Sequence, residues 1–267
     1  MARRAANGNN KGGSGKTGIT INTAASMAER GMRVLLVDLD PQANLTRRMG
    51  YPFDPANPLP GTPEAIKDGG EGVAASVVLP CRWGGIYTER IRIIPSRFDL
   101  ENRVAEAGVV GAVSRFRRAM IGVDEDDDVT MVDLQPSLGH LTQMGLAAVQ
   151  HVFGVVDPEI DGIEGAIRLR NFARTFAADL GNPDLNMAGF IVSRYRSNIN
   201  AHSYQVERLP DSLGAANILD PIMPERSAVK DAADTAQPLR ALGTASGRET
   251  AGLFDTLTTD YLKRIGA

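Results

Sequence analysis

Apolar residues along this chain follow two patterns: short continuous runs, and longer stretches in which they recur every three or four residues. The run in "MRVLLVDLD" (32–40) is typical of a strand buried on both faces, whereas "KTGITINTAASMAER" (16–30) has helical spacing. On this basis we expect strands at 33–38, 91–94, 129–133, 152–156 and 187–193, with a less regular one at 217–219. The expected helices are 16–30, 62–68, 98–121, 139–149, 161–180, 199–213, 226–236 and 248–265.

The alternation of strands and helices predicts an α/β fold, a doubly wound and mostly parallel sheet with helices on both faces. We expect residues 1–267 to form a single domain. Segment 51–90 begins with a stretch dense in proline and glycine and is expected to be an irregular excursion. Segment 246–267 is expected to be a C-terminal helix that packs on the domain. Ligands of such folds bind beyond the carboxyl ends of the strands.

One glycine-rich stretch, "NNKGGSGKTG" (9–18), has the features of a phosphate-binding loop. Its glycines let the backbone turn N–H groups toward an anion, and the N-terminus of the following helix adds partial positive charge. Lys16 is placed to reach the outer phosphates, and Thr17 offers a hydroxyl to Mg²⁺. Lys11 is a second lysine, which such a loop does not need. The preceding "MARRAANG" (1–8) is a poor strand, so the first strand is either short and held by tertiary contacts or atypical.

Three aspartates follow predicted strands. Asp38 and Asp40 close the run at 32–40, and Asp133 follows the apolar "VTMV" (129–132). Asp38 and Asp40 are two residues apart, so both face the same side if the strand continues. Phosphoryl transfer needs a metal ion, charge neutralisation and a positioned water more than covalent help from the protein. Because Mg²⁺ prefers oxygen ligands, the pattern favours a magnesium–nucleotide site at this edge.

Six segments of the chain resemble the ParA/MinD family of ATPases with a deviant Walker A loop. They are 11–17, 37–46 ("VDLDPQANLT"), 131–142 ("MVDLQPSLGHLT"), 155–169, 189–198 and 222–239. The likeness is greatest to the ParA-type partition ATPases. It implies a P-loop ATPase domain that hydrolyses ATP to ADP and phosphate, with ATP and Mg²⁺ as cofactors and a homodimer that forms on ATP binding.

The resemblance also implies roles for the loop and the acids. Lys11 is implied to cross the dimer interface to the phosphates bound by the other subunit, while Lys16 binds those of its own nucleotide. Asp40 is implied to position the attacking water, Asp133 to act as the Walker B acid, and Asp38 to support the metal and the loop lysine. The implied catalytic residues are Lys11, Lys16 and Asp40; the implied metal-site residues are Thr17, Asp38, Asp40 and Asp133. The segment with Gln42 and Asn44 is implied to be a switch that reports the γ-phosphate.

Further nucleotide contacts are implied in the second half of the chain. Pro224 lies in a segment that resembles the family's adenine-side segment, with a simple turn proline as the alternative. Arg194 follows the apolar "GFIV" (189–192) and is a second candidate for a place near the base, with a surface arginine as the alternative. Gly18 departs from the family, because the usual residue there has a hydroxyl that contacts the α-phosphate; the loss is about 0.5–1.5 kcal/mol, or at most about tenfold in affinity. Gln135 and Asp157 are further departures. The implied nucleotide-binding set is Lys11, Gly12, Gly13, Ser14, Gly15, Lys16, Thr17, Gly18, Arg194 and Pro224.

A ParA-type dimer is expected to bind DNA without sequence preference and to be stimulated by a separate, ParB-like centromere-binding protein. The candidate DNA-binding residues are Arg194, Arg196, Arg226 and Lys230, with scattered surface arginines as the alternative interpretation. Only eleven residues precede Gly12, which is too few for a helix-turn-helix, so we expect no operator-reading domain.

Composition narrows the classes of function. The net charge is −3 and the pI is near 5.7, which confines any DNA contact to a local patch. The sequence contains no run of about 18 apolar residues and no signal-peptide pattern, so we expect a cytoplasmic protein, associated with the nucleoid by resemblance and not with a membrane. The single cysteine, Cys81, forms neither an internal disulfide nor an iron–sulfur site, which excludes the nitrogenase iron-protein class.

Two alternatives stay open. A MinD-like membrane-associated positioning ATPase needs a terminal amphipathic helix with a basic face. Here Asp255 and Asp260 lie opposite the apolar stripe, and Lys263 and Arg264 come only at the end, which suits packing on the domain. The other alternative is a dimeric nucleotide-binding scaffold with little hydrolysis, for which Gly18 is the hint.

Overall fold

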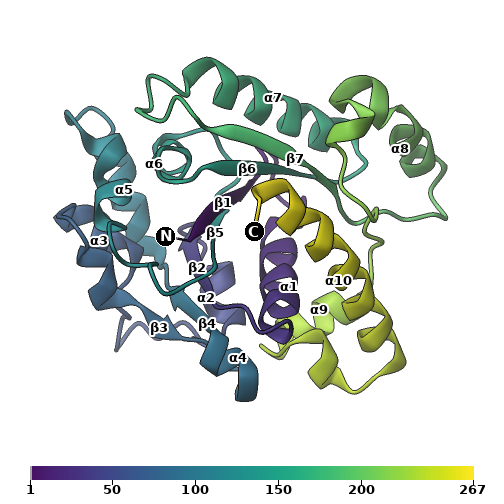
Figure 1. Cartoon of the computed structure of the whole chain (residues 1–267), viewed down its shortest axis with the longest axis horizontal. Coiled ribbons are helices and arrows are strands. Elements are labelled where there is room, and N and C mark those ends of the chain that lie inside the picture. Colours follow the sequence, from purple (N-terminus) through teal and green to yellow (C-terminus); the bar gives the residue numbers. More distant parts are fainter. Residues whose placement is uncertain (1) are drawn as a thin grey trace.

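A seven-stranded sheet runs through the middle of the molecule, in the order β3-β4-β2-β5-β1-β6-β7 (Figure 1). The computed structural model describes residues 2–267; Met1, where the expected domain begins, lies outside the described residues. Neighbouring strands are parallel except β3 and β4, which pair antiparallel. The strands are β1 Arg3–Gly8, β2 Val34–Leu39, β3 Leu79–Pro80, β4 Ile91–Ile94, β5 Val129–Leu134, β6 His151–Val156 and β7 Asn186–Val192. The predicted fold class is confirmed.

The first strand, β1, is central although its sequence is polar. It pairs with β5 on one side and β6 on the other. Ala5 and Ala6 are fully buried, and the Arg4 guanidinium forms a buried ion pair with Asp124 at 2.7 Å. A buried charge is tolerated where it is paired and hydrogen-bonded. Of the two sequence-based alternatives, the strand held by tertiary contacts is therefore correct.

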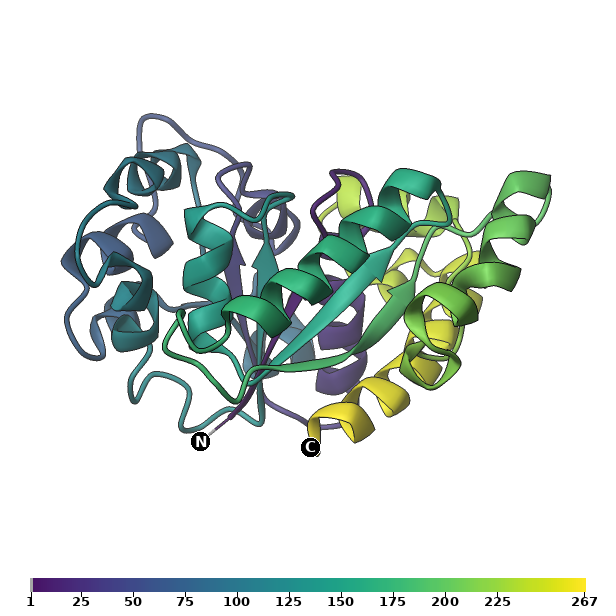
Figure 2. The same cartoon turned by 90° about the horizontal axis from the view of Figure 1, so that it is seen from above.

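Helices cover both faces of the sheet. One face carries α1, α4, α9 and α10, and the other carries α3, α5, α6 and α7, with α8 packed beside α7 (Figures 1 and 2). The α-helices are α1 Lys16–Glu29, α2 Asn44–Arg48, α3 Thr62–Asp68, α4 Gly85–Arg90, α5 Arg115–Ala119, α6 His140–Ala148, α7 Ile160–Phe176, α8 Asn200–Leu213, α9 Ser227–Asp234 and α10 Ala245–Ile265. Both termini lie at the amino ends of the strands, away from the glycine-rich loop (Figure 2).

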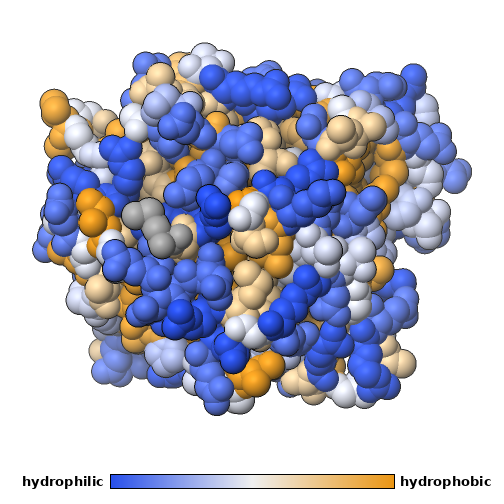
Figure 3. All heavy atoms as spheres, viewed as in Figure 1, coloured by the Kyte–Doolittle hydropathy of each residue, from blue (hydrophilic) through white to orange (hydrophobic). Residues whose placement is uncertain are grey.

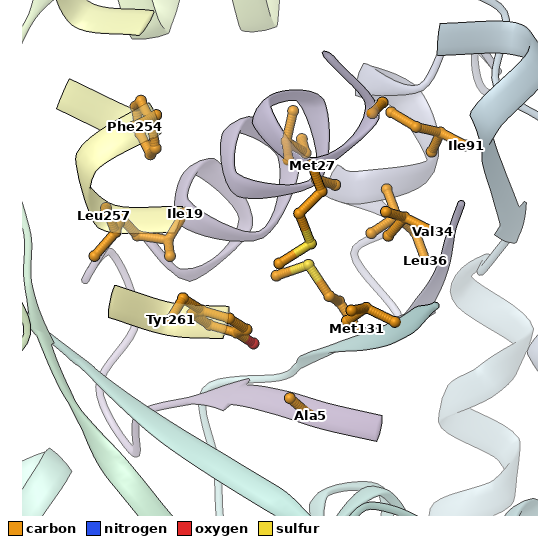
Figure 4. Packing of buried hydrophobic residues seen from close by; sticks show 14 of the residues in the cluster. Ala5, Ile19, Met27, Val34, Leu36, Ile91, Met131, Phe254, Leu257 and Tyr261 are labelled. Atoms are coloured by element: carbon orange, nitrogen blue, oxygen red, sulfur yellow. The ribbon is translucent and has the colours of Figure 1, made fainter. Parts of the chain in front are cut away.

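The core on the α1 face fixes the helix that follows the loop. Met27 of α1 meets Met131 of β5, and Leu257 of α10 lies beside Ile19 (Figure 4). Tyr261 of α10 stacks on Phe153 with 4.0 Å between ring centroids. The apolar stripe of α10 is thus buried against the domain, while the surface around it is largely hydrophilic (Figure 3). Among residues 2–267 no helix combines the length and apolar character needed to cross a bilayer.

Three expectations about the elements need correction. The single helix expected at 98–121 is wrong: the segment forms 3-10 turns at Phe98–Glu106 and Ala112–Ser114 before α5. Gly111 breaks it with a left-handed φ of 77°. The weak strand at 217–219 is only a bridge between Ile218 and Phe190. Segment 51–90 is less irregular than expected, since it contains α3, β3 and α4 as well as a 3-10 turn at Val73–Val77.

Candidate functional site

The glycine-rich loop joins the carboxyl end of β1 to α1. Gly13 and Gly15 have φ values of 83° and 89°, which side chains disfavour. No side chain caps α1 at Gly15, and its first turn contains no acidic residue, so the backbone N–H groups there suit an anion. Ser14 is fully buried, and its hydroxyl has no partner among the described residues. The loop therefore has the shape and polarity of a phosphate cradle.

Lys16 lies inside this cradle. Its residue is 7% exposed, and its Nζ donates to the backbone oxygen of Lys11 at 3.3 Å. Burial lowers the pKa of Lys16, while the negative charges of Asp133, Asp40 and Asp157 act to raise it. A nucleotide phosphate would add negative charge next to this cation.

The Walker B candidate is connected directly to the loop helix. Asp133 is the last but one residue of β5, and its Oδ2 accepts a hydrogen bond of 2.6 Å from the Thr17 hydroxyl. Burial raises the pKa of Asp133 to about 6, against the effects of Thr17 and Lys16. A divalent cation lowers the pKa of neighbouring carboxyls. Thr17 and Asp133 are thus placed to hold Mg²⁺, directly or through water.

Asp38 lies beside Asp133, since the two residues are in register on neighbouring strands. The Thr46 hydroxyl and backbone N–H donate to its Oδ2 at 2.7 and 2.8 Å. Burial, followed by the charge of Asp133, raises the pKa of Asp38 to about 7. Within residues 2–267 no hydrogen bond or ion pair joins Asp38 to Lys16, and the hydrogen bonds of Asp38 go to Thr46 and the Asp40 backbone. Its carboxylate instead fastens α2 to β2.

Asp40 has a freer carboxylate. Its Oδ1 accepts the Gln42 backbone N–H at 2.9 Å, an Asx turn at the start of the expected switch segment. Within residues 2–267 its Oδ2 makes no hydrogen bond, although the residue is only 8% exposed. One oxygen therefore holds the turn while the other is available to a water molecule.

A cavity of about 620 Å³ opens beside the loop helix, large enough for a nucleoside. Gly15 and Gly18 line it together with Pro224, which lies in the segment before α9. Arg194 also lines it, with its guanidinium bonded to the Gly13 carbonyl and to Glu225. A Cβ at Gly18 would meet only Val229 Cγ1, at 3.6 Å. The structure thus brings the predicted base-side residues next to the phosphate loop.

The four candidate DNA-binding residues lie in or beside the wall of this cavity, and three of them pair with acids. Arg196 pairs with Glu225 at 3.3 Å, and Arg226 pairs with Glu249 at 3.1 Å. Arg194, Arg226 and Lys230 line the cavity itself. Arg196 alone of the four lies outside its wall, with a side chain 44% exposed.

Sequence reasoning missed the partners of Lys11. Its Nζ forms ion pairs with Asp157 at 2.8 Å and Glu159 at 2.7 Å, beside a cavity of about 220 Å³. Partial burial acts to lower the pKa of Lys11, but these two carboxylates outweigh it and raise the pKa. The only sequence feature that pointed to these partners was the unusual Asp157-Pro158 pair after β6.

A second large cavity, of about 610 Å³, lies on the other side of the switch segment. Prolines and aromatics such as Pro52, Phe53 and Phe98 line it together with Arg47, and it contains no residue of the glycine-rich loop. Of these two large cavities, the one beside α1 is therefore the one that adjoins the glycine-rich loop.

Among residues 2–267 no group of three or more His, Cys, Asp or Glu side chains forms a ready-made metal site. Mg²⁺ in phosphoryl-transfer sites is usually held by one or two protein oxygens, substrate phosphates and water. Thr17 and Asp133 meet that requirement.

Comparisons with known proteins agree with this geometry. A model of the AAA domain family matches residues 2–187. The chain is 35% identical over 195 residues to the chromosome-partitioning ATPase Soj of Thermus thermophilus, covering 72% of this chain and 70% of Soj. It is 34% identical over 195 residues to an uncharacterized protein of Mycobacterium tuberculosis, covering 70% of this chain but only 56% of that relative's length.

Solved structures show the same fold. Apo McdA of Cyanothece superposes with a TM-score of 0.83 at 20% identity, covering 98% of this chain and 100% of McdA. Cobyrinic acid a,c-diamide synthase of Mycobacterium smegmatis, solved with ADP and magnesium, gives a TM-score of 0.73 at 29% identity, covering 92% of this chain and 96% of the synthase. The chain belongs to the AAA-domain family of P-loop ATPases, as a ParA-type member of the ParA/MinD group with a deviant Walker A loop.

Proposed function

We propose that this chain is an ATP-hydrolysing DNA partition ATPase, in which ATP and Mg²⁺ bind at the glycine-rich loop. One observation carries the proposal. Lys16 is buried in the glycine-rich loop at the N-terminus of α1, which no side chain caps, and it lies next to Thr17, whose hydroxyl is hydrogen-bonded to Asp133. We include in it one ATPase domain over 1–267, with 246–267 as its packing helix.

The catalytic part follows from charge and position. Mg²⁺ supplies charge neutralisation between the phosphates when bound. Lys16 binds the outer phosphates, and Thr17 and Asp133 orient the metal. Asp40 accepts a hydrogen bond from the attacking water through the oxygen that the Asx turn leaves available. Each group is fixed by α1, β2 or β5, so little reorganisation accompanies the reaction.

Alanine in place of Asp40 is expected to leave ATP binding intact and to lower the hydrolysis rate by about 100-fold or more, because the water loses its acceptor. Phosphate release at saturating ATP measures the rate, and nucleotide titration measures binding. Asp54→Ala is the matched control, since Asp54 is an exposed carboxylate bonded only within its own turn. A wild-type rate in Asp40→Ala would show that Asp40 is only a turn residue.

The partition part of the proposal involves a second subunit, DNA and a protein partner. ATP joins two copies of the chain, with Lys11 reaching the phosphates of the other subunit. The dimer binds DNA without sequence preference, and a separate ParB-like centromere-binding protein stimulates hydrolysis. The relationship to Soj supports this reading, as does the placement of Lys11 at the loop entrance. The expected location is the cytoplasm, on the nucleoid.

Charge reversal at Arg196 is expected to weaken ATP-dependent DNA binding by about tenfold or more without changing dimerisation. A dimer places two such residues side by side, and each phosphate contact adds about 0.9 to the log–log salt slope, so losing two removes about 1.8. Anisotropy titrations of duplex DNA at several salt concentrations measure both quantities.

Arg168→Glu is the control for this charge change, because Arg168 is an exposed arginine of α7 with a side chain 60% exposed. DNA binding equally strong without nucleotide, or equal in Arg196→Glu and wild type, would move support to the alternative of scattered surface arginines.

No specific observation favours either alternative function, the MinD-like membrane-associated ATPase or the nucleotide-binding scaffold. The apolar stripe of α10 that a MinD-like membrane contact needs is buried, with Phe254, Leu257 and Tyr261 at 3% exposure or less. Phosphate release from ATP by the wild-type chain distinguishes an active ATPase from a scaffold with little hydrolysis.

A further inference from the structure

Arg48 is an arginine without a carboxylate partner in the wall of the nucleotide cavity. It is the last residue of α2 and is half-buried, and no ion pair involves it among residues 2–267. The other two arginines of this wall are paired, Arg194 with Glu225 and Arg226 with Glu249. Desolvating a guanidinium is costly unless an anion accepts its hydrogen bonds. Arg48 is therefore a cation in the cavity wall that is available to pair with an anionic ligand.

Gly18 leaves room next to this arginine. Gly18 and Arg48 together line the nucleotide cavity and a smaller hollow beside it, so the two residues lie at one place on the wall. Gly18 is the third residue of α1, close to the anion-binding end of the helix. A Cβ there would meet only Val229 Cγ1, at 3.6 Å, so a small side chain would fit at position 18.

Arg48 shares its cavity wall with residues from both ends of the site, Gly15 of the phosphate loop and Pro224 of the base-side segment. Burial lowers the pKa of Arg48, the charge of Asp133 acts to raise it, the neighbouring Arg47 acts to lower it, and Asp234 acts to raise it. Asp133 marks the phosphate end, and Asp234 lies on α9, which follows the base-side Pro224. The part of a nucleotide between its outer phosphates and its base is the α-phosphate and ribose.

We propose that Arg48 binds the α-phosphate of the nucleotide and supplies a contact that a glycine at position 18 does not make. The inference rests on the proposed function, since the cavity must hold a nucleotide. A guanidinium matches phosphate oxygens with two parallel N–H donors, which a lysine does not reproduce. Because ATP and ADP share the α-phosphate, the contact acts equally on both.

Calorimetric titration with ATP·Mg²⁺ and with ADP·Mg²⁺ tests the contact. Arg48→Ala is expected to weaken both nucleotides by about 10- to 100-fold and by equal factors, and Arg48→Lys is expected to recover only part of the loss. Arg47→Ala is the matched control, because the neighbouring Arg47 faces the other large cavity and bonds to Gln42 and Asn44.

A second variant separates binding from a purely structural role at the end of α2. In the Arg48→Ala background, Gly18→Ser is expected to restore affinity by up to about tenfold, since the added hydroxyl fits the open space and can donate to the same phosphate. In wild type the same change has little effect. A structural role predicts instead a lower melting temperature without nucleotide and no rescue.

The inference is overturned if wild type binds nucleotide and Arg48→Ala binds ATP and ADP as tightly. It is also overturned if only ATP binding falls, which would place the contact on the γ-phosphate. A wild-type chain that binds neither nucleotide would contradict the proposed function itself, and the wild-type titration shows this before any variant is made.

Discussion

Replacing Lys16 by alanine is expected to abolish ATP binding, with a loss of affinity of at least about 100-fold. Lys16 is the one lysine buried inside the glycine-rich loop, where the negative charges of Asp133 and Asp40 act on its ammonium. Without it, a polyphosphate entering the loop would meet these carboxylates without the balancing cation. Leaving a buried charge uncompensated costs about 3–5 kcal/mol, which corresponds to roughly 10²- to 10³-fold or more in affinity. Titration with ATP·Mg²⁺ measures the effect.

Lys67→Ala is the control for this variant, because Lys67 is an exposed lysine of α3. Circular dichroism of both variants establishes that they are folded. Tight ATP binding by a folded Lys16→Ala protein would show that the glycine-rich loop is not the phosphate site.

Replacing Lys11 by alanine is expected to leave ATP binding close to wild type, unlike the Lys16 change, and to abolish ATP-dependent dimerisation. Within its own chain, the Lys11 ammonium pairs with Asp157 and Glu159 rather than with the loop interior. Its own nucleotide therefore does not depend on it. Reaching another subunit requires exchanging these carboxylates for phosphate, and charge-assisted bonds to phosphate are strong where water is excluded. Sedimentation velocity with ATP·Mg²⁺ measures the dimer.

The expected loss of dimerisation in Lys11→Ala follows from the two symmetric Lys11 contacts that each dimer would contain. At about 1.5–3 kcal/mol for each charged hydrogen bond, the dimerisation constant falls by roughly 10²-fold or more. Lys67→Ala again serves as the control. A Lys11→Ala protein that binds ATP and still dimerises would refute the role across the interface and leave Lys11 as a partner of Asp157 only.

Most of the sheet was predictable from sequence because its strands are short apolar runs buried on both faces. β2, β4 and β5 begin and end within one residue of the expected bounds. β1 was not clear from its own residues, since its polar side chains are satisfied by partners distant in sequence, such as Asp124 for Arg4. The expected helix at 98–121 failed because apolar spacing does not register the backbone freedom of Gly111.

The candidate site also has residues that could be predicted from the sequence and residues that could not. The loop residues and Asp133 could be placed from spacing, because a strand, a turn and a helix N-terminus fix their positions. The role of Asp38 could not, since its hydrogen bonds depend on how α2 returns to β2. Arg48 carried no motif at all, and only its position beside Gly18 in the folded chain gives it a function.

Sedimentation velocity of the wild-type chain with no nucleotide, with ADP·Mg²⁺ and with ATP·Mg²⁺, each with and without a labelled DNA duplex, tests ATP-dependent dimerisation and DNA binding together. We expect a monomer without nucleotide and with ADP, a dimer with ATP, and co-sedimentation of DNA with the ATP-bound dimer alone. One and the same oligomeric state in all three nucleotide conditions, or DNA bound equally in all of them, would contradict this expectation.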